Sequence, residues 1–250
     1  IALAGNSVFI EQIGTSTDTT VNIDIGGNNN SVNLSMEGTG NELDFKQEGN
    51  NNTISWVSYW GSGKAWGGDL DGNNNTLKFE QYNTTGSDSN KIGFHMLGNS
   101  NELHVCQGAT FSSSTDTTCS GTTPNSEYGG HTVNLDVHAN GNSIKVGQET
   151  GTGNADHYAQ IYYFGGDNND TFLTQKGNGN KTLNMIVRTD GGEQELMQKG
   201  DGAHTATIDL TGSYHTDMSM TQQGNTAQSY SLTQNCQTSG GCSVSVTQGN

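Results

Sequence analysis

Nine glutamines occupy equivalent places in a repeated phrase, and their primary amides are the side chains whose spacing suits a defined chemistry. The phrase runs from a small polar residue through alternating apolar residues to Gln and a Gly- or Asn-rich bend, as in residues 41–49 (NELDFKQEG). A primary amide donates and accepts hydrogen bonds, so identical amides stacked at the spacing of neighbouring strands can bond in a continuous ladder. The predicted ladder consists of Gln12, Gln47, Gln81, Gln107, Gln148, Gln175, Gln198, Gln222 and Gln248.

The direction of these side chains follows from strand parity. Gln47 is an even number of residues from Leu43 and Phe45, so it points to the same, inward face. A buried amide is costly unless its donors and acceptor are satisfied, which a ladder achieves. Asparagines at the bends could form a second ladder; the alternative is that the Asn and Gln are solvated turn residues. These asparagines are Asn6, Asn41, Asn75, Asn101 and Asn142.

Four cysteines lie in two close pairs, Cys106 with Cys119 and Cys236 with Cys242. In a secreted chain an even count predicts disulfides, and proximity favours pairing within each pair, although sequence alone does not fix connectivity. The alternative is free buried thiols. Neither pair has the CxxC spacing of redox and metal sites, so a disulfide role is favoured over that chemistry.

Catalytic motifs are not found in the sequence. The seven histidines are dispersed without metal-ligand spacing, and neither GxSxG nor a phosphate-binding loop occurs. Paired carboxylates on a β-helix can cleave polysaccharide, but no specific pair stands out. We therefore predict that the chain is not an enzyme and uses no metal ion or cofactor.

A second apolar alternation lies between successive glutamine phrases and usually lacks the Gln. Examples are Val21/Ile23/Ile25 and residues 183–187 (LNMIV). Apolar residues at every second position indicate a strand with one buried face, and no sustained helical period occurs. Each repeat therefore holds two strands joined by Gly- and Asn-rich bends, whose residues tolerate positive φ.

The repeat length decides between hairpins and stacked arches, because both use such bends. Successive ladder glutamines are 35, 34, 26, 41, 27, 23, 24 and 26 residues apart. A period of this size is typical of stacked units that bury their faces on one another. We predict one all-β repeat domain over 1–250, a β-solenoid of stacked two-strand arches with about nine rungs and two facing parallel sheets. Insertions are expected at about 58–72 and 108–130.

The composition fits a thin core. Only 29% of residues are hydrophobic, with 36 Gly and 1 Pro. Such a polar chain could also be disordered as a monomer, but the regular strand alternation weighs against disorder. The near absence of Pro is consistent with strands that pair on both edges.

On these repeats the chain resembles the curlin repeat family, the secreted bacterial subunits of functional amyloid fibres. The family pattern is approximately Ser-x5-Gln-x-Gly-x-x-Asn-x-Ala-x5-Gln. Residues 41–52 match its first half with Asn in place of Ser, and Gln222, Gly224, Asn225, Ala227 and Gln234 approximate its second half. The resemblance implies a curlin-like fold, an extracellular location in a cell-surface fibre, and a secretion pore and a nucleator as partners.

The ends of the predicted stack bear on function. The repeat starts within the first residues and continues to the last, so both terminal rungs are expected to be open to a further copy of the chain. We therefore expect a structural subunit that polymerises head to tail into an extracellular fibre for biofilm matrix or adhesion. The predicted polymer interface is Val8, Ile10, Gln12, Val244, Val246 and Gln248.

The charge balance bears on partners. With 9 Lys+Arg against 25 Asp+Glu, the net charge is −16, which disfavours nucleic acid. We expect salt to speed polymerisation by screening the acidic repulsion. No membrane-spanning run is found, and a start at Ile1 without Met suits a mature secreted product.

Aromatic side chains gather in or near the expected insertions. Tyr59, Trp60 and Trp66 lie in the first, and Tyr158 and residues 162–164 (YYF) lie on a strand-like segment. Exposed, they could bind glycans, contact a cell surface or pack filaments together; buried, they would widen the core locally. The alternative function is therefore a soluble secreted β-solenoid that binds or cleaves extracellular glycan.

Overall fold

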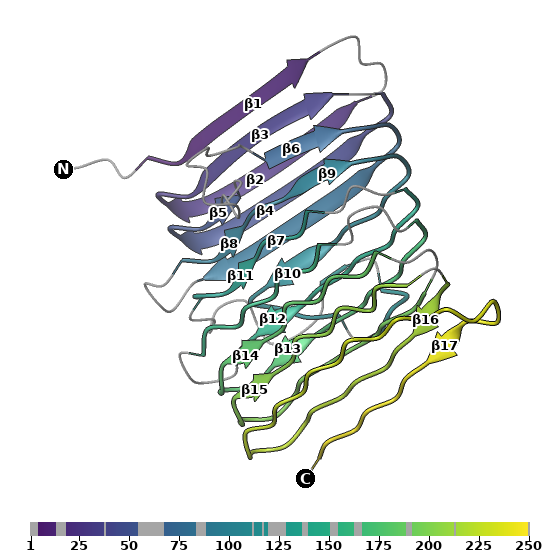
Figure 1. Cartoon of the computed structure of the whole chain (residues 1–250). Coiled ribbons are helices and arrows are strands. Elements are labelled where there is room, and N and C mark those ends of the chain that lie inside the picture. Colours follow the sequence, from purple (N-terminus) through teal and green to yellow (C-terminus); the bar gives the residue numbers. More distant parts are fainter. Residues whose placement is uncertain are drawn as a thin grey trace, which may run out of the picture.

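The computed structural model describes an all-β chain built from parallel strands (Figure 1). The residues that the structure describes are 5–13, 19–37, 39–54, 68–83, 89–111, 113–116, 118–119, 129–136, 140–150, 155–162, 167–188, 192–212 and 214–249. Within these ranges every strand pair is parallel, and no helix is long and apolar enough to cross a bilayer. This arrangement is compatible with the predicted β-solenoid class.

Two main sheets run along the stack, and within each sheet a strand pairs with strands of neighbouring turns. The first sheet contains β1 (Ser7–Ile13), β3 (Ser31–Glu37), β5 (Thr53–Ile54), β6 (Gly68–Asp71), β8 (Lys91–Ile92), β9 (His95–Leu97) and β11 (Thr132–Val133). The second sheet contains β2 (Thr20–Asn28), β4 (Glu42–Asn50), β7 (Thr76–Asn83), β10 (Val105–Gln107), β12 (Gln148–Glu149) and β13 (Gln175–Lys176).

Towards the C-terminus the paired segments become short. They are β14 (Lys181–Thr182) with β15 (His204–Thr205), and β16 (Thr216–Asp217) with β17 (Cys242–Ser243). Isolated parallel bridges connect the first of these pairs to the first sheet, because Tyr158 bridges both Thr132 and Thr182 of β14, and Thr205 of β15 bridges Ser229.

Register is kept along each sheet. We call the residues that lie directly opposite one another in the first sheet the first register line; it consists of Ser7, Ser31, Thr53, Lys91, Thr132, Tyr158, Thr182, Thr205 and Ser229. The second register line, in the second sheet, begins with Thr20, Glu42, Thr76, Glu102, Ser143 and Asp170. Equal register is what makes like residues stack.

The core is the thin layer between the sheets. In β4, Leu43, Phe45 and Gln47 are buried while Glu42 and Asp44 are exposed, which is the alternation expected of a strand with one buried face. Aromatic rings stack from one turn to the next: the ring centroids of Phe45 and Phe79 are 5.2 Å apart. Aliphatic side chains of both sheets complete a single buried cluster along the stack.

The first expected insertion ends earlier than the sequence predicts. Residues 55–67, with Tyr59, Trp60 and Trp66, lie outside the described residues, but β6 is a strand of the first sheet. The expectation of an insertion as far as residue 72 was therefore wrong for Gly68–Asp71, whose alternation is too short to recognise from sequence.

Bends bring backbones of neighbouring turns so close that a side chain would not fit. Gly200 has φ of +80°, and a Cβ there would lie 2.1 Å from the carbonyl oxygen of Gly224. Glycine tolerates both the left-handed backbone and the close approach.

Replacing Gly200 with Ala should lower the free energy of unfolding by more than about 1 kcal/mol, since both φ and space are incompatible with a Cβ. Urea denaturation measures this loss. Gly240→Ala is the matched control, because a Cβ at Gly240 meets no atom within 4 Å. Equal losses in the two variants would contradict this account of the bends.

Candidate functional site

The glutamines of the second sheet form a buried ladder along the stack. Nε2 of Gln47 donates to Oε1 of Gln81 at 2.8 Å, and Gln81 donates to Gln107 at 2.8 Å. The same bond joins Gln107 to Gln148 at 3.0 Å and Gln148 to Gln175 at 2.9 Å. All five side chains are fully buried, so each amide replaces its lost hydration with a neighbour's amide.

Each ladder amide also donates across the core to the first sheet. Its acceptor is the backbone carbonyl of the residue on the first register line in the same turn; for Gln107 this is Lys91, at 3.0 Å. The acceptors for Gln47, Gln81, Gln148, Gln175, Gln198, Gln222 and Gln248 are Ser31, Thr53, Thr132, Tyr158, Thr182, Thr205 and Ser229. One side chain therefore ties the turns together along the stack and the two sheets together across it.

The ladder has two runs with opposite donor directions. Gln222 donates to Gln198 at 2.8 Å, and Gln248 donates to Gln222, towards the N-terminus rather than away from it. Gln175 and Gln198, where the runs meet, each keep their bond to the first sheet, at 2.8 and 2.9 Å. The cross-core bond is thus common to both runs.

Gln12 does not belong to the ladder, contrary to the prediction. It lies in β1 opposite Met36 of the first sheet, while the residue opposite Gln47 in the second sheet is Ile25. Bend hydrogen bonds explain the placement, because the backbone N–H of Asn30 donates to Oδ1 of Asn6 at 3.0 Å and aligns these two turns. Oε1 of Gln47 consequently has no partner.

A second column of amides stands at one corner between the sheets. The backbone N–H of Asn75 donates to Oδ1 of Asn41 at 3.0 Å, and the bond repeats from Asn101 to Asn75, Asn142 to Asn101, and Asn169 to Asn142. The predicted asparagine ladder is therefore present for four of its five members. Asn6 was wrongly included, since it caps the opposite corner.

The opposite corner holds buried residues that sequence reasoning missed. We call them the corner column: Asn30, Asn52, Asn90, His131, His157, Lys181 and His204, all fully buried. Histidine replaces asparagine because its Nδ1 can accept a backbone N–H as Oδ1 does: His131 accepts from His157, and His157 accepts from Lys181, both at 3.3 Å. The shared role is hidden in sequence because the residue types differ.

Two of the corner histidines, His157 and His204, are held in one neutral tautomer. Nε2 of His157 lies 3.1 Å from the carbonyl oxygen of Glu149, and Nε2 of His204 lies 2.8 Å from that of Lys199. A carbonyl only accepts, so Nε2 carries the proton and Nδ1 is free to accept. A proton on Nδ1 would turn this acceptor into a donor that faces the backbone N–H of the next turn, and the hydrogen bond would be lost.

Burial accordingly lowers the pKa of these imidazoles. The pKa of His157 falls from 6.5 to about 3, chiefly through burial and further through Lys181, although the bond to Glu149 raises it. The pKa of His131 is well below 6.5 for the same first reason, and then because His157 lies beside it with ring centroids 4.9 Å apart. These rings resist protonation while the chain is folded.

Lys181 occupies the same column as a buried cation. Its Nζ donates to the carbonyl oxygens of Gly179, Gly200 and Gly202, at 2.5 to 2.8 Å. Burial lowers its pKa from 10.5 to about 8, although Asp201 raises it. The ammonium's three donors are therefore all used within the bends, and the amine has a structural role.

Both predicted disulfides are present. Cys106 pairs with Cys119 and Cys236 with Cys242, with Cα–Cα distances of 5.9 and 5.8 Å. The first joins the second sheet to the segment after it. The second closes the last bend of the described stack.

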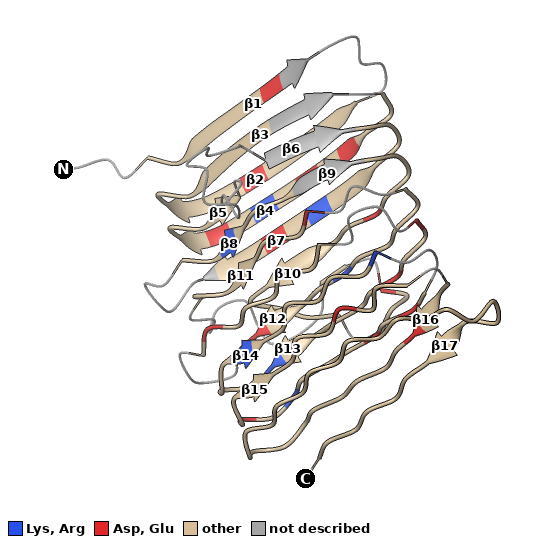
Figure 2. Cartoon of the chain, in the orientation of Figure 1, with Lys and Arg blue, Asp and Glu red and all other residues tan. Residues whose placement is uncertain are grey.

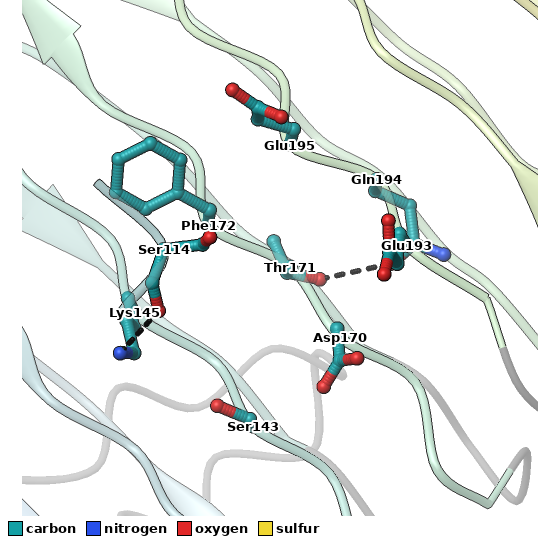
Figure 3. Close-up of a pocket in the computed structure, with 9 residues that line it drawn as sticks. All are labelled: Ser114, Ser143, Lys145, Asp170, Thr171, Phe172, Glu193, Gln194 and Glu195. Atoms are coloured by element: carbon teal, nitrogen blue, oxygen red, sulfur yellow. Dashed lines mark hydrogen bonds between the residues drawn. The ribbon is translucent and has the colours of Figure 1, made fainter. Parts of the chain in front are cut away.

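A shallow pocket of about 210 Å³ lies on the outer side of the second sheet (Figure 3). Three carboxylates, Asp170, Glu193 and Glu195, line it, and burial followed by the charge of Glu193 raises the pKa of Asp170. Lys145 also lines the pocket, and its Nζ donates to the carbonyl oxygens of Ser114 and Asp116. In the described ranges no three His, Cys, Asp or Glu side chains are grouped to hold a metal ion.

The strands at the two ends of the stack expose apolar side chains. In the first turn Val8, Phe9 and Val21 are 49%, 56% and 37% exposed, although the residues opposite Val8 and Val21 in the next turn, Val32 and Leu43, are buried. At the other end Val244 and Val246 pack on the core but are only partly buried. The predicted interface residues therefore lie at opposite ends of the molecule (Figure 1).

Comparison with known proteins gives no match: no family model fits the chain, and neither a curated protein nor a solved structure is similar to it.

Substituting Leu for Gln222 should lower the free energy of unfolding by about 1–3 kcal/mol, because it strips partners from Gln198, Gln248 and the Thr205 carbonyl. The neighbouring Gln223 is exposed, so Gln223→Leu is the control and should change stability by less than about 0.5 kcal/mol. Chemical denaturation of both variants measures the difference. Indistinguishable stabilities would mean that the ladder contributes nothing.

Stability should fall as pH drops below 6.5. The unfolded histidines bind protons from about pH 6.5, whereas folded His157 does so only near 3, so stability is complete above 6.5 and is lost between these values. His157 alone should remove about 2 kcal/mol at pH 5.

The variant His157→Asn, which places the residue of earlier turns at this corner, should retain about 2 kcal/mol more of its pH 7 stability at pH 5 than wild type does. The control is His215→Asn, which makes the same substitution at an exposed histidine outside the corner column. Denaturation across pH 4–8 measures both. A wild-type profile in the His157 variant would refute the tautomer argument.

Proposed function

We propose that this protein is a structural subunit that polymerises head to tail into an extracellular, curlin-like fibre serving a biofilm matrix or adhesion. The observation that carries the proposal is a pair of unpaired strand edges at opposite ends of one parallel stack. Among the described residues β1 pairs only with β3, and β2 only with β4. Such edges are templates for another chain.

The two ends are compatible because the stack is parallel. With the predicted number of about nine rungs, each rising about 4.8 Å, the stack would be about 43 Å long. In a parallel stack every rung presents the same kind of edge to the rung that follows it. The last rung of one copy can therefore pair with the first rung of the next copy as successive rungs pair within one chain. A contact between unlike ends does not close on itself, so it extends into a filament.

Charge favours end contacts over side contacts. The chain carries −16 overall, yet no charged residue occurs from Met218 to Asn250, and the first turn carries only Glu11 and Asp24 in β1 and β2. In Figure 2 the last turns of the chain are tan, whereas red and blue residues are scattered over the turns before them. Side-by-side association would bring acidic flanks together, whereas addition at the ends adds few like charges.

Incubated protein should form unbranched filaments by electron microscopy, with a fibre-diffraction reflection at about 4.8 Å along the axis. The control is the double variant Val8→Asp, Val21→Asp, which places charges on two exposed edge positions and should stay monomeric while folding normally. Wild-type protein that remains monomeric after prolonged incubation would contradict the function and favour a soluble solenoid.

A further inference from the structure

The register of the first sheet identifies which strands would meet at a junction between copies. Ser7 of β1 and Ser229 both lie on the first register line. A copy that continues this line therefore sets residues 7–12 against 229–234.

Val244 and Val246, which the predicted interface also includes, follow β17 in the line of the second sheet. The backbone N–H of Met218 donates to the Glu193 carbonyl, Gly192 bridges Asn169 next to the second register line, and β16 pairs with β17. Stacking Val8 and Ile10 on these valines would therefore join strands of opposite sheets.

At this junction, two glutamines meet. Gln12 and Gln234 each lie five residues beyond the first register line, so they hold the same position at the two ends of one column. The close approach of Gly212 to Cys236, where a Cβ would lie 2.6 Å from the Cys236 nitrogen, shows that the register holds to the end of this segment. The position of Gln234 in the column therefore follows from the bridge at Ser229 before it and the close approach at Cys236 after it.

The same column is apolar inside the molecule. Met36, Leu70 and Met96 lie opposite one another from Gln12 onward, and Val187 and Leu210 are fully buried at the equivalent place in later turns. A glutamine at each end of an apolar column has no partner amide within its own chain's column. A second copy stacked in register supplies that partner to both.

We propose that the two ends form a self-recognition site in which Gln12 of one copy and Gln234 of the next form an amide pair that sets the register of the junction. The inference rests on the proposed head-to-tail function. Around the pair, Val8 meets Tyr230 and Ile10 meets Leu232, apolar on apolar. A slip by one residue turns every side chain to the wrong face, and a slip by two leaves both amides against apolar neighbours.

The second sheet tolerates the same register. There Gln248 of one copy faces Ile25 of the next, and Val246 faces Ile23. Nε2 of Gln248 donates to Gln222 and to the Ser229 carbonyl, so only Oε1 of Gln248 remains to face the junction. A glutamine oxygen beside Ile25 already exists inside the chain, at Gln47.

Cysteine cross-linking of filaments tests the register. Phe9 and Ser231 are both exposed and lie two residues beyond the first register line. A mixture of Phe9→Cys and Ser231→Cys proteins should give a covalent dimer under mild oxidation. Phe9→Cys mixed with Ser245→Cys, the equivalent exposed position of the other sheet, is the matched control and should give none.

Filament growth of leucine variants tests the amide pair. Gln12→Leu or Gln234→Leu alone should slow elongation about fivefold or more, because one amide is left unpaired. The double variant should grow within about twofold of wild type, since the column is then apolar throughout. The exposed-site variant Gln223→Leu should grow normally.

The outcomes separate the two claims. If wild-type protein forms filaments but the mixture of Phe9→Cys and Ser245→Cys proteins cross-links, the register is overturned and the fibre function stands. The same conclusion follows if the single leucine variants grow like wild type. Failure of wild-type protein to form filaments would overturn both.

Discussion

The two-way hydrogen bonding of the ladder glutamines is the interaction on which the rest of the structure depends. One N–H of Gln81 reaches the amide of the next turn at 2.8 Å, and the other reaches the Thr53 carbonyl across the core at 3.2 Å. A thin core cannot supply the burial of a large globule, so the hydrogen bonds of the polar groups inside it weigh heavily on stability. In-register stacking lets the ladder glutamines bond to one another, and only at its first rung is a buried ladder oxygen, Oε1 of Gln47, without a partner among the described residues.

The corners extend this logic to the bends. Asn30 donates to two bend carbonyls, at 3.0 and 2.9 Å, while its oxygen accepts the backbone N–H of Asn52 at 2.9 Å. His157 does the same with its two ring nitrogens, and Lys181 bonds to bend carbonyls with three donors. Changing the residue type while keeping the bonding pattern gives the C-terminal half a sensitivity to acid that asparagine would not confer.

The sequence predicts strands, inward-facing side chains and cysteine pairs correctly, because these depend on residues close together in the chain. It misleads about which residues of successive turns lie opposite one another. The alternation around Gln47 predicts both its strand and its inward face, and the proximity of the cysteines predicts their pairing. Gln12 sits in an almost identical phrase, yet bonds at Asn6 place it in the other sheet. The corner histidines and the carboxylates of Asp170 and Glu193 could not be anticipated, because insertions of different length hide which residues of successive turns become neighbours.

The central claim is that one hydrogen-bonded column continues from chain to chain. A cryo-electron microscopy structure of the filament tests it most directly. The account predicts an unbroken rise of about 4.8 Å per rung through the junction, with residues 7–12 of one copy stacked on 229–234 of the next. A gap or a change of register at the junction, or subunits joined through their acidic flanks, would contradict it.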